Sequence, residues 1–218
     1  MIITAKKVYG QKVALDVSCL KFEQGKIYAL IGANGSGKST LLKCLANIVD
    51  FDGEIKEPIK DMAYMPQHSY AFSISVKNNI LLAFPFKERK KHLESVDKII
   101  EKLELGKLKN KNASRLSGGE TQKTALARLM VKKHCALLLD EPTSAMDIKA
   151  ALKVENELIN YAKEHNTTVI FATHSLRQAS LAHEVIFLKD GYVVEREQSA
   201  NILKSPKKAE TKEFIDFF

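Results

Sequence analysis

One stretch constrains this chain more than any other: Gly32-Ala33-Asn34-Gly35-Ser36-Gly37-Lys38-Ser39-Thr40. An apolar run, residues 27–31, precedes it, and a run with helical character follows from Leu41. The spacing fits G-x-x-x-x-G-K-[ST], a phosphate-binding loop set between a strand and a helix. Glycines allow several backbone N–H groups to converge on a triphosphate at dihedral angles that other residues avoid. We therefore expect a triphosphate site here, against the simpler alternative of a glycine-rich turn without a ligand.

Within this loop the residue types predict separate tasks. The helix that begins near Lys38 directs its positive dipole end toward an anion. Lys38 is expected to reach the β- and γ-phosphates, and the Ser39 hydroxyl is expected to ligate Mg²⁺. The expected ligand contacts of the loop are Gly32, Asn34, Gly35, Ser36, Gly37, Lys38, Ser39 and Thr40.

Composition narrows the class of protein. The 218 residues, 45% hydrophobic and 28% charged, suit one substantial core rather than two independent domains. The sequence has neither an apolar run long enough to span a bilayer nor a secretory signal at its start, so we expect a cytosolic protein. The net charge of +8 fits a polyanionic ligand, an anionic membrane face or simply a solvated surface. Basic and aromatic residues do not interleave as a nucleic-acid platform requires, so no nucleic-acid partner is expected.

The N-terminal part reads as strands. Residues 2–8 and 13–23 are predicted strands around a turn at Gly10, and apolar side chains alternate along the second: Val13, Leu15, Val17 and Cys19. Tyr9 at that turn either stacks on a purine ring or packs at a strand end. Two further short strands are expected at 54–57 and 61–65. The three cysteines, Cys19, Cys44 and Cys135, form no CxxC pair and are expected to be buried as small hydrophobic side chains.

From about 75 to 133 the pattern becomes helical, with one apolar face made by Leu93, Val96, Ile100 and Leu103. Ser117 and Glu120 then form a capping box, S-x-x-E, at the start of another helix. A capping box does not account for Gly118 and Gly119, because each glycine costs about 1 kcal/mol in a helix. Bare amides at an exposed helix start bind anions, which predicts a second phosphate contact.

Two buried strands are expected to end in chemically active side chains. Residues 136–139 are apolar without alternation, as in a central parallel strand, and run into Asp140 and Glu141. Ligands bind at the carboxyl ends of such strands, so Asp140 is expected to hold Mg²⁺ and Glu141 to polarise an attacking water. The alternative is an acidic strand end that caps the next turn. Strand 168–172 leads to His174, which is either structural or a γ-phosphate contact.

The remaining segments complete an alternating α/β pattern. They are a helix at 148–163 with Asp147 as a possible N-cap, a hairpin of 185–188 and 192–195 around Asp190-Gly191, and two short helices within 198–218.

In this order, the motifs resemble those of the ATPase subunit of ABC transporters: the phosphate loop, Gln67 after a short strand, Leu116-Ser117-Gly118-Gly119-Glu120, the strand that ends at Asp140-Glu141, Ser144-Ala145-Met146-Asp147, and His174. The resemblance covers nearly the whole chain. It implies an α/β P-loop NTPase core with a parallel sheet, an N-terminal antiparallel β subdomain and an α-helical subdomain inserted at about 70–130, all within a single domain, 1–218. It also implies ATP and Mg²⁺ as cofactors.

The same resemblance implies the role of each motif. Tyr9 would stack on adenine, Gly32–Thr40 would be the Walker A loop, and Gln67 would sense Mg²⁺ and the γ-phosphate. The signature motif would consist of Ser117, Gly118, Gly119 and Glu120. Asp140 would be the Walker B acid, Glu141 the general base, Asp147 part of the D-loop and His174 the switch histidine. Lys38, Gln67, Glu141 and His174 would act in catalysis, and Ser39, Gln67 and Asp140 would hold the metal. Two departures from the family pattern, Lys123 and Lys133-His134, leave the phosphate contacts intact.

The resemblance further implies a head-to-tail homodimer that closes around two ATP molecules. Separate transmembrane permease subunits would dock near Gln67 and residues 72–76, an extracytoplasmic solute-binding protein would deliver the solute, and the chain would lie on the inner face of the cell membrane. Residues 173–179 and 185–188 most resemble subunits of oxyanion importers, tungstate or molybdate above all. The alternatives are an exporter or lipoprotein-release ATPase, a non-transport relative acting in DNA repair or on the ribosome, and a non-enzymatic regulator. The short interval between Gln67 and Leu116 disfavours the non-transport relatives, and Glu141 with His174 disfavours the regulator.

Overall fold

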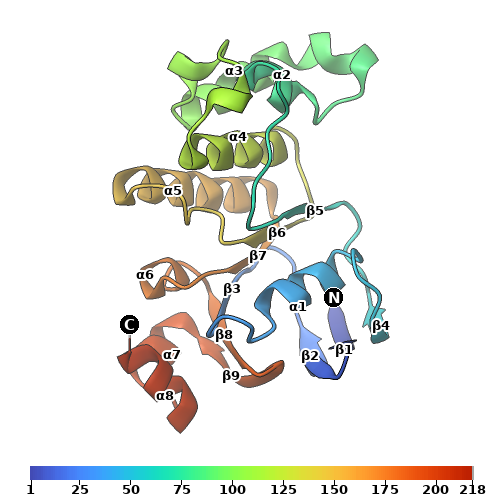
Figure 1. The fold of residues 1–218 in the computed structure, drawn as a ribbon, viewed down its shortest axis with the longest axis vertical. Coiled ribbons are helices and arrows are strands. Elements are labelled where there is room, and N and C mark those ends of the chain that lie inside the picture. The colour runs from blue at the N-terminus through green and yellow to red at the C-terminus, as the bar shows by residue number, and fades with distance from the viewer. Residues whose placement is uncertain (218) are drawn as a thin grey trace. The chain divides into compact units, whose positions relative to one another are not determined.

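The computed structural model describes residues 1–217, which divide into two compact units (Figure 1). The first unit contains Met1–Tyr64, Cys135–Glu141 and the described residues from Asn166 onward. The second contains Met65–His134 and Pro142–His165, and so includes the whole segment, about 75 to 133, expected to be helical. Phe218, the last residue of the predicted tail, lies outside the described residues.

A three-stranded antiparallel sheet opens the first unit, in the order β2-β1-β4. Its strands are β1 (Ile2–Tyr9), β2 (Lys12–Lys21) and β4 (Asp52–Lys56). The predicted pair of strands around Gly10 is therefore confirmed, as is a strand near 54–57. Ile3 of β1 and Leu15 of β2 are fully buried beneath this sheet, because alternation along each strand points one face at the core.

The alternation predicted for β2 fails at its end. Ile3 pairs with Leu20 but Ala5 pairs with Val17, so β2 has one extra residue opposite Thr4. Such a bulge inverts the alternation, and Cys19 (φ 51°) becomes exposed while Leu20 points into the core. The expectation that all three cysteines are buried is wrong for Cys19; Cys44 is buried and Cys135 is half-buried.

The second sheet of the first unit has six strands in the order β5-β6-β7-β3-β8-β9. They are β3 (Ile27–Ile31), β5 (Met62–Met65), β6 (Ala136–Asp140), β7 (Thr168–Ala172), β8 (Glu184–Lys189) and β9 (Tyr192–Gln198). Strands β6, β7, β3 and β8 are parallel, and β9 pairs antiparallel with β8 as the predicted hairpin. Every residue of β3, β6 and β7 is buried, as expected for central strands covered on both faces. Because these strands are parallel, the loops that follow them leave the sheet at the same edge.

The helices of the first unit are α1 (Lys38–Leu45), α6 (Leu176–Ala179), α7 (Ser199–Lys204) and α8 (Ala209–Asp216). Leu41, Leu42 and Leu45 of α1 are fully buried in the core shared with both sheets, and each contributes about 2 kcal/mol by burial. This packing anchors α1 directly behind the loop that precedes it. Helices α7 and α8, red in Figure 1, confirm the two short helices predicted for the tail and lie beside β9.

The second unit is helical. Its elements are α2 (Val76–Leu81), α3 (Leu93–Lys102), α4 (Gly118–Met130) and α5 (Ile148–His165), with short 3₁₀ turns at Phe86–His92, Gly106–Leu108 and Ala113–Arg115. Val96, Ile100 and Leu103 are buried as predicted, whereas Leu93, the first residue of α3, is 39% exposed. Among residues 1–217, none of the helices combines the length and apolar character needed to cross a bilayer.

Candidate functional site

The glycine-rich loop lies between the end of β3 and the start of α1, as predicted, and its backbone is tightly enclosed. A Cβ on Gly32 would lie 2.2 Å from the carbonyl oxygen of Leu188, and a Cβ on Gly37 would lie 2.8 Å from that of Ala14. Both glycines also have positive φ, 145° and 105°. Only glycine therefore fits these two positions, where the loop passes β8 on one side and β2 on the other.

Lys38 is folded back onto this loop. Its side chain is buried, and Nζ donates to the carbonyl oxygens of Gly32 (2.6 Å) and Ala33 (3.0 Å). Burial lowers the pKa of Lys38, while the nearby Glu141 and Asp140 carboxylates oppose that shift. A cation held in this position neutralises part of the charge of a bound polyphosphate.

Two further features make the loop suited to an anion. Helix α1 has Gly37 as its N-cap and no side chain caps its first turn, so its leading N–H groups point toward the loop. The buried hydroxyl of Ser36 has no hydrogen-bond partner in the structure, which leaves a polar group for a ligand to satisfy.

Asp140 and Ser39 meet at the carboxyl end of β6. Asp140 is only 4% exposed, and burial raises the pKa of its carboxyl group, while a hydrogen bond from the Ser39 hydroxyl and the nearby Lys38 lower it. A carboxylate and a hydroxyl oxygen are the hard donors that Mg²⁺ prefers, and a cation would offset the cost of burying this charge. Residues 1–217 contain no group of three or more His, Cys, Asp or Glu side chains able to hold a metal.

Glu141 is joined to His174, a pairing that the sequence did not predict. Nε2 of His174 lies 2.7 Å from Oε1 of Glu141, and the backbone N–H of Glu141 donates to Ala172 at 3.0 Å, so β7 and its following loop hold both ends of the residue. Glu141 has φ 49°, a conformation that costs about 1 kcal/mol or more for a non-glycine residue. The strained backbone and the histidine together hold the carboxylate in one orientation.

Tyr9 lies at the end of β1 with its ring half-exposed and the Lys7 ammonium 5.1 Å from the ring centroid. Tyr9 is therefore not buried in the core, and its contact with a nucleotide stays a prediction. Sequence reasoning missed Lys12, which pairs with Tyr9 across the hairpin. The Nζ atom of Lys12 would lie 3.9 Å from a Cβ atom added to Gly35, so the lysine is next to the loop. Only the hairpin register could have indicated it.

In the second unit, Ser117 and Glu120 form the predicted capping box. The Ser117 hydroxyl accepts the Glu120 N–H at 3.3 Å, and the Glu120 carboxylate accepts the Ser117 N–H at 2.8 Å. Gly119 has a packing reason that the capping box does not supply, because a Cβ there would lie 2.8 Å from the carbonyl oxygen of Ala145. Gly118 meets only the Ala145 side chain, at 3.4 Å.

The segment before α5 is clamped against α4 by Gln122, which sequence reasoning missed. Gln122 is 4% exposed; its Nε2 donates to the Ser144 hydroxyl (3.1 Å) and its Oε1 accepts the Ala145 N–H (3.0 Å). Asp147 accepts the Ala150 N–H at 2.9 Å and so caps α5. Gln67 is exposed in the segment between β5 and α2.

The structure thus brings Lys38, Ser39, Asp140, Glu141 and His174 together in the first unit, beside the loop. The second unit carries Gln67, the start of α4 and Asp147. A buried cation, helix amides, a desolvated carboxylate and an oriented base are the parts needed to bind and hydrolyse a nucleoside triphosphate.

Comparison with known proteins shows the same family throughout. A family model described as ABC transporter matches residues 15–144. The tungstate uptake system ATP-binding protein TupC of Peptoclostridium acidaminophilum is 37% identical, over 87% of this chain and 94% of its own length. The phosphate import ATP-binding protein PstB 1 of Ligilactobacillus salivarius is 34% identical, over 95% and 88%. A spermidine/putrescine import ATP-binding protein PotA of Chromobacterium violaceum is 32% identical, over 96% of this chain and 62% of its own length.

Solved structures agree in fold. The dimeric structure of MJ0796, a bacterial ABC transporter cassette, has a TM-score of 0.80 at 25% identity, over 91% of this chain and 99% of that one. A dimeric post-hydrolysis state of the same cassette bound to ADP and Pi gives a TM-score of 0.78 at 23% identity, over 91% and 96%. The expected α/β cassette fold, with its antiparallel N-terminal sheet and helical insertion, is confirmed. The family match and the relatives above 30% identity show that this chain belongs to the ABC transporter family and is one of its ATP-binding, ATP-hydrolysing subunits.

Proposed function

We propose that the chain is the ATPase of an import system for an oxyanion such as tungstate, and that its two units act as one cassette, residues 1–218. The observation that carries the ATPase chemistry is the 2.7 Å contact between Glu141 and His174 beside the buried Lys38. TupC at 37% identity supports tungstate as the solute, ahead of phosphate at 34% and spermidine or putrescine at 32%.

In the proposed ATP site, Tyr9 stacks on adenine and the loop amides with the α1 N-terminus cradle the phosphates. Lys38 exchanges the carbonyls of Gly32 and Ala33 for phosphate oxygens, a trade between acceptors that keeps its charge satisfied. Ser39 and Asp140, with Gln67, would hold Mg²⁺, whose charge would offset that of the triphosphate. Glu141 accepts the proton of the attacking water, and His174 keeps that carboxylate in place.

We further propose that two copies enclose two ATP molecules, as the dimeric cassettes of the relatives suggest. The start of α4, with Ser117, Gly118 and Gly119, contacts the triphosphate held by the loop of the other copy, and Asp147 lies at the same junction. ATP then supplies contacts available only in the closed dimer, and hydrolysis removes them. This cycle is the source of the motion delivered to the permease.

The segment after Gln67 is the proposed docking surface for membrane permease subunits. Tyr70, Phe72 and Ile74 are exposed there, and the two rings meet edge to face with centroids 5.1 Å apart. Arg128 of α4 orders them by donating to the Tyr70 carbonyl at 3.0 Å and lying 5.8 Å from the Phe72 ring. Exposed, prearranged aromatic side chains of this kind favour a protein partner. The chain would lie on the inner face of the membrane, with a solute-binding protein on the other side.

A deletion and complementation experiment tests this proposal. Cells that lack the gene should accumulate less tungstate, measured by elemental mass spectrometry, while uptake of phosphate and of radiolabelled spermidine stays normal. The wild-type gene should restore uptake and Lys38→Ala should not. Loss of phosphate or spermidine uptake with normal tungstate accumulation would contradict the assigned solute while leaving the ATPase assignment in place.

A further inference from the structure

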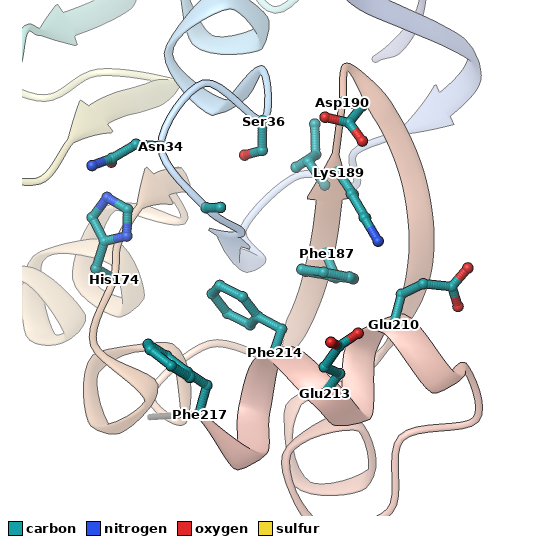
Figure 2. A pocket seen from close by; sticks show the side chains of 12 residues that line it. Asn34, Ser36, His174, Phe187, Lys189, Asp190, Glu210, Glu213, Phe214 and Phe217 are labelled. Carbon is teal, nitrogen blue, oxygen red and sulfur yellow. The ribbon is translucent and has the colours of Figure 1, made fainter.

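We propose that Gly191, in the turn between β8 and β9, is a positioning residue for the phosphate-binding loop and sets the direction of the Gly37 N–H. The inference rests on the phosphate-binding role proposed for Gly32–Thr40. Gly191 lies outside that motif in the sequence, yet it contacts both the loop and the strand β2. Figure 2 shows the loop, marked by Ser36, and the turn between β8 and β9, marked by Asp190.

Two backbone hydrogen bonds make Gly191 a bridge. Its N–H donates to the carbonyl oxygen of Ser36 at 3.0 Å, and its own carbonyl oxygen accepts the N–H of Asp16 in β2 at 2.8 Å. The loop follows β3 of the six-stranded sheet, whereas β2 is a strand of the three-stranded sheet. The turn therefore joins the loop to the hairpin that carries Tyr9.

The first of these bonds determines how one peptide group of the loop is oriented. Every peptide bond of the described residues is trans, so the C=O of Ser36 and the N–H of Gly37 point in opposite directions. With the carbonyl directed at Gly191, the Gly37 N–H points away from the turn, to the opposite side of the loop. In the proposed site the phosphate would lie on that side, and an N–H already held in that direction would need no reorganisation when the phosphate binds.

The turn position strongly favours glycine. Gly191 has φ +88°, and a Cβ there would lie 3.1 Å from both the carbonyl carbon of Ala14 and the nitrogen of Leu15. Both neighbours are backbone atoms, so they cannot rotate away as a side chain would. An added methyl group displaces the turn relative to β2 by a few tenths of an ångström. Because the N–H and the carbonyl of Gly191 carry the two bonds of the bridge, we expect this displacement to disturb the hydrogen bond to Ser36.

The test is Gly191→Ala in the full chain, with affinities for ATP and adenosine measured by competition against a fluorescent ATP analogue. The dissociation constant for ATP should rise about tenfold, as expected for one misdirected N–H contact to a charged group. Adenosine has no phosphates, so its affinity should stay unchanged. A purely structural role would lower the melting temperature and leave the ratio of the two affinities as in the wild type.

Gly25→Ala is the matched control. Gly25 also has positive φ (+74°), but it precedes β3 at the other edge of the sheet, and its Cβ would meet only the side-chain amide of Asn166. This variant should lose stability and keep the wild-type ratio of ATP to adenosine affinity.

A second variant acts on the other side of the bridge without touching Gly191. Asp16→Pro removes the N–H that Gly191 accepts, and it is tolerable because β2 is an edge strand and this N–H faces away from β1. It should weaken ATP binding in the same sense, whereas Asp16→Ala, which keeps the N–H, should not.

Lys38→Ala should abolish ATP binding, which shows that the assay reports on the proposed site. In that case, an unchanged ATP affinity in folded Gly191→Ala overturns the inference. If Gly191→Ala does not fold, an unchanged ATP affinity in Asp16→Pro overturns it. If Lys38→Ala binds ATP like the wild type, the proposed site itself is wrong and the inference falls with it.

Discussion

Glu195 in β9 holds the C-terminal helix through its carboxylate, which makes it a sensitive test of the packing described above. The side chain is 7% exposed and accepts the N–H groups of Lys207 (2.8 Å) and Lys208 (3.0 Å), immediately before α8. Helix α8 has no side-chain cap of its own. Its Phe214 packs against Phe187 of β8 with ring centroids 5.0 Å apart.

Glu195→Gln keeps the shape and removes the charge. Two hydrogen bonds to an ionised acceptor become one good bond and one donor facing an NH₂ group, and the favourable charge at the helix N-terminus is lost. The expected cost is about 2 kcal/mol for undocking α8, which corresponds to roughly a thirtyfold rise in its opening equilibrium. Hydrogen exchange of the peptide covering residues 206–216, read by mass spectrometry, measures that rise directly.

The pH dependence gives an independent check. Burial raises the pKa of Glu195, but the N–H groups of Lys207 and Lys208 and the nearby Lys207 charge oppose it, and the pKa is held below the ordinary 4.5. The stabilisation is therefore complete above 4.5 and is lost as the pH falls through the lower pKa of the folded state. The ratio of exchange rates between variant and wild type should be largest at neutral pH and should shrink below about pH 4.5.

Glu197→Gln is the control, since Glu197 lies two residues along the same strand and pairs with the exposed Lys207 ammonium. Its effect on exchange in α8 should be far smaller. Equal exchange in Glu195→Gln and wild type at neutral pH would refute the reasoning. Phe214 of α8 and Phe217, which follows the helix, line a cavity of about 510 Å³ that Asn34 and His174 also line (Figure 2).

Three further predictions concern catalysis and the clamp on α4. Glu141→Gln should bind ATP but lose about a hundredfold or more in ATP turnover. With ATP it should elute as a dimer in size-exclusion chromatography with light scattering. A strictly monomeric elution at high protein concentration would contradict the shared-site proposal. His174→Ala should lower kcat at least tenfold with little change in ATP affinity, because it frees the Glu141 carboxylate, and an unchanged kcat would show that the 2.7 Å contact is idle. Gln122→Leu should destabilise the Ser144–Ala145 segment by about 2 kcal/mol, seen as faster hydrogen exchange there, and equal exchange would show that its two hydrogen bonds hold nothing.

Local patterns in the sequence were enough to predict most of the elements. The apolar runs at 27–31, 136–139 and 168–172 are continuous because these strands are buried on both faces, and that burial leaves a direct trace in composition. The capping box at Ser117 and Glu120 is equally local, since both of its hydrogen bonds close within four residues. Candidate site residues could be predicted in the same way, because the phosphate-binding loop and the strand-end carboxylates are motifs of consecutive residues.

The tertiary structure decided whatever depends on two segments meeting. The bulge that exposes Cys19 arises from the register of β2 against β1. The alternation of apolar residues within β2 does not predict that register. The contact of Glu141 with His174 exists because parallel strands β6 and β7 end side by side, and Gly119 is required by the approach of Ala145. The sequence by itself determined the chemistry available to this protein, since side-chain type and local spacing are covalent properties. Which groups touch was left to the fold, because a contact between distant segments depends on packing and register, and neither is a property of a single segment.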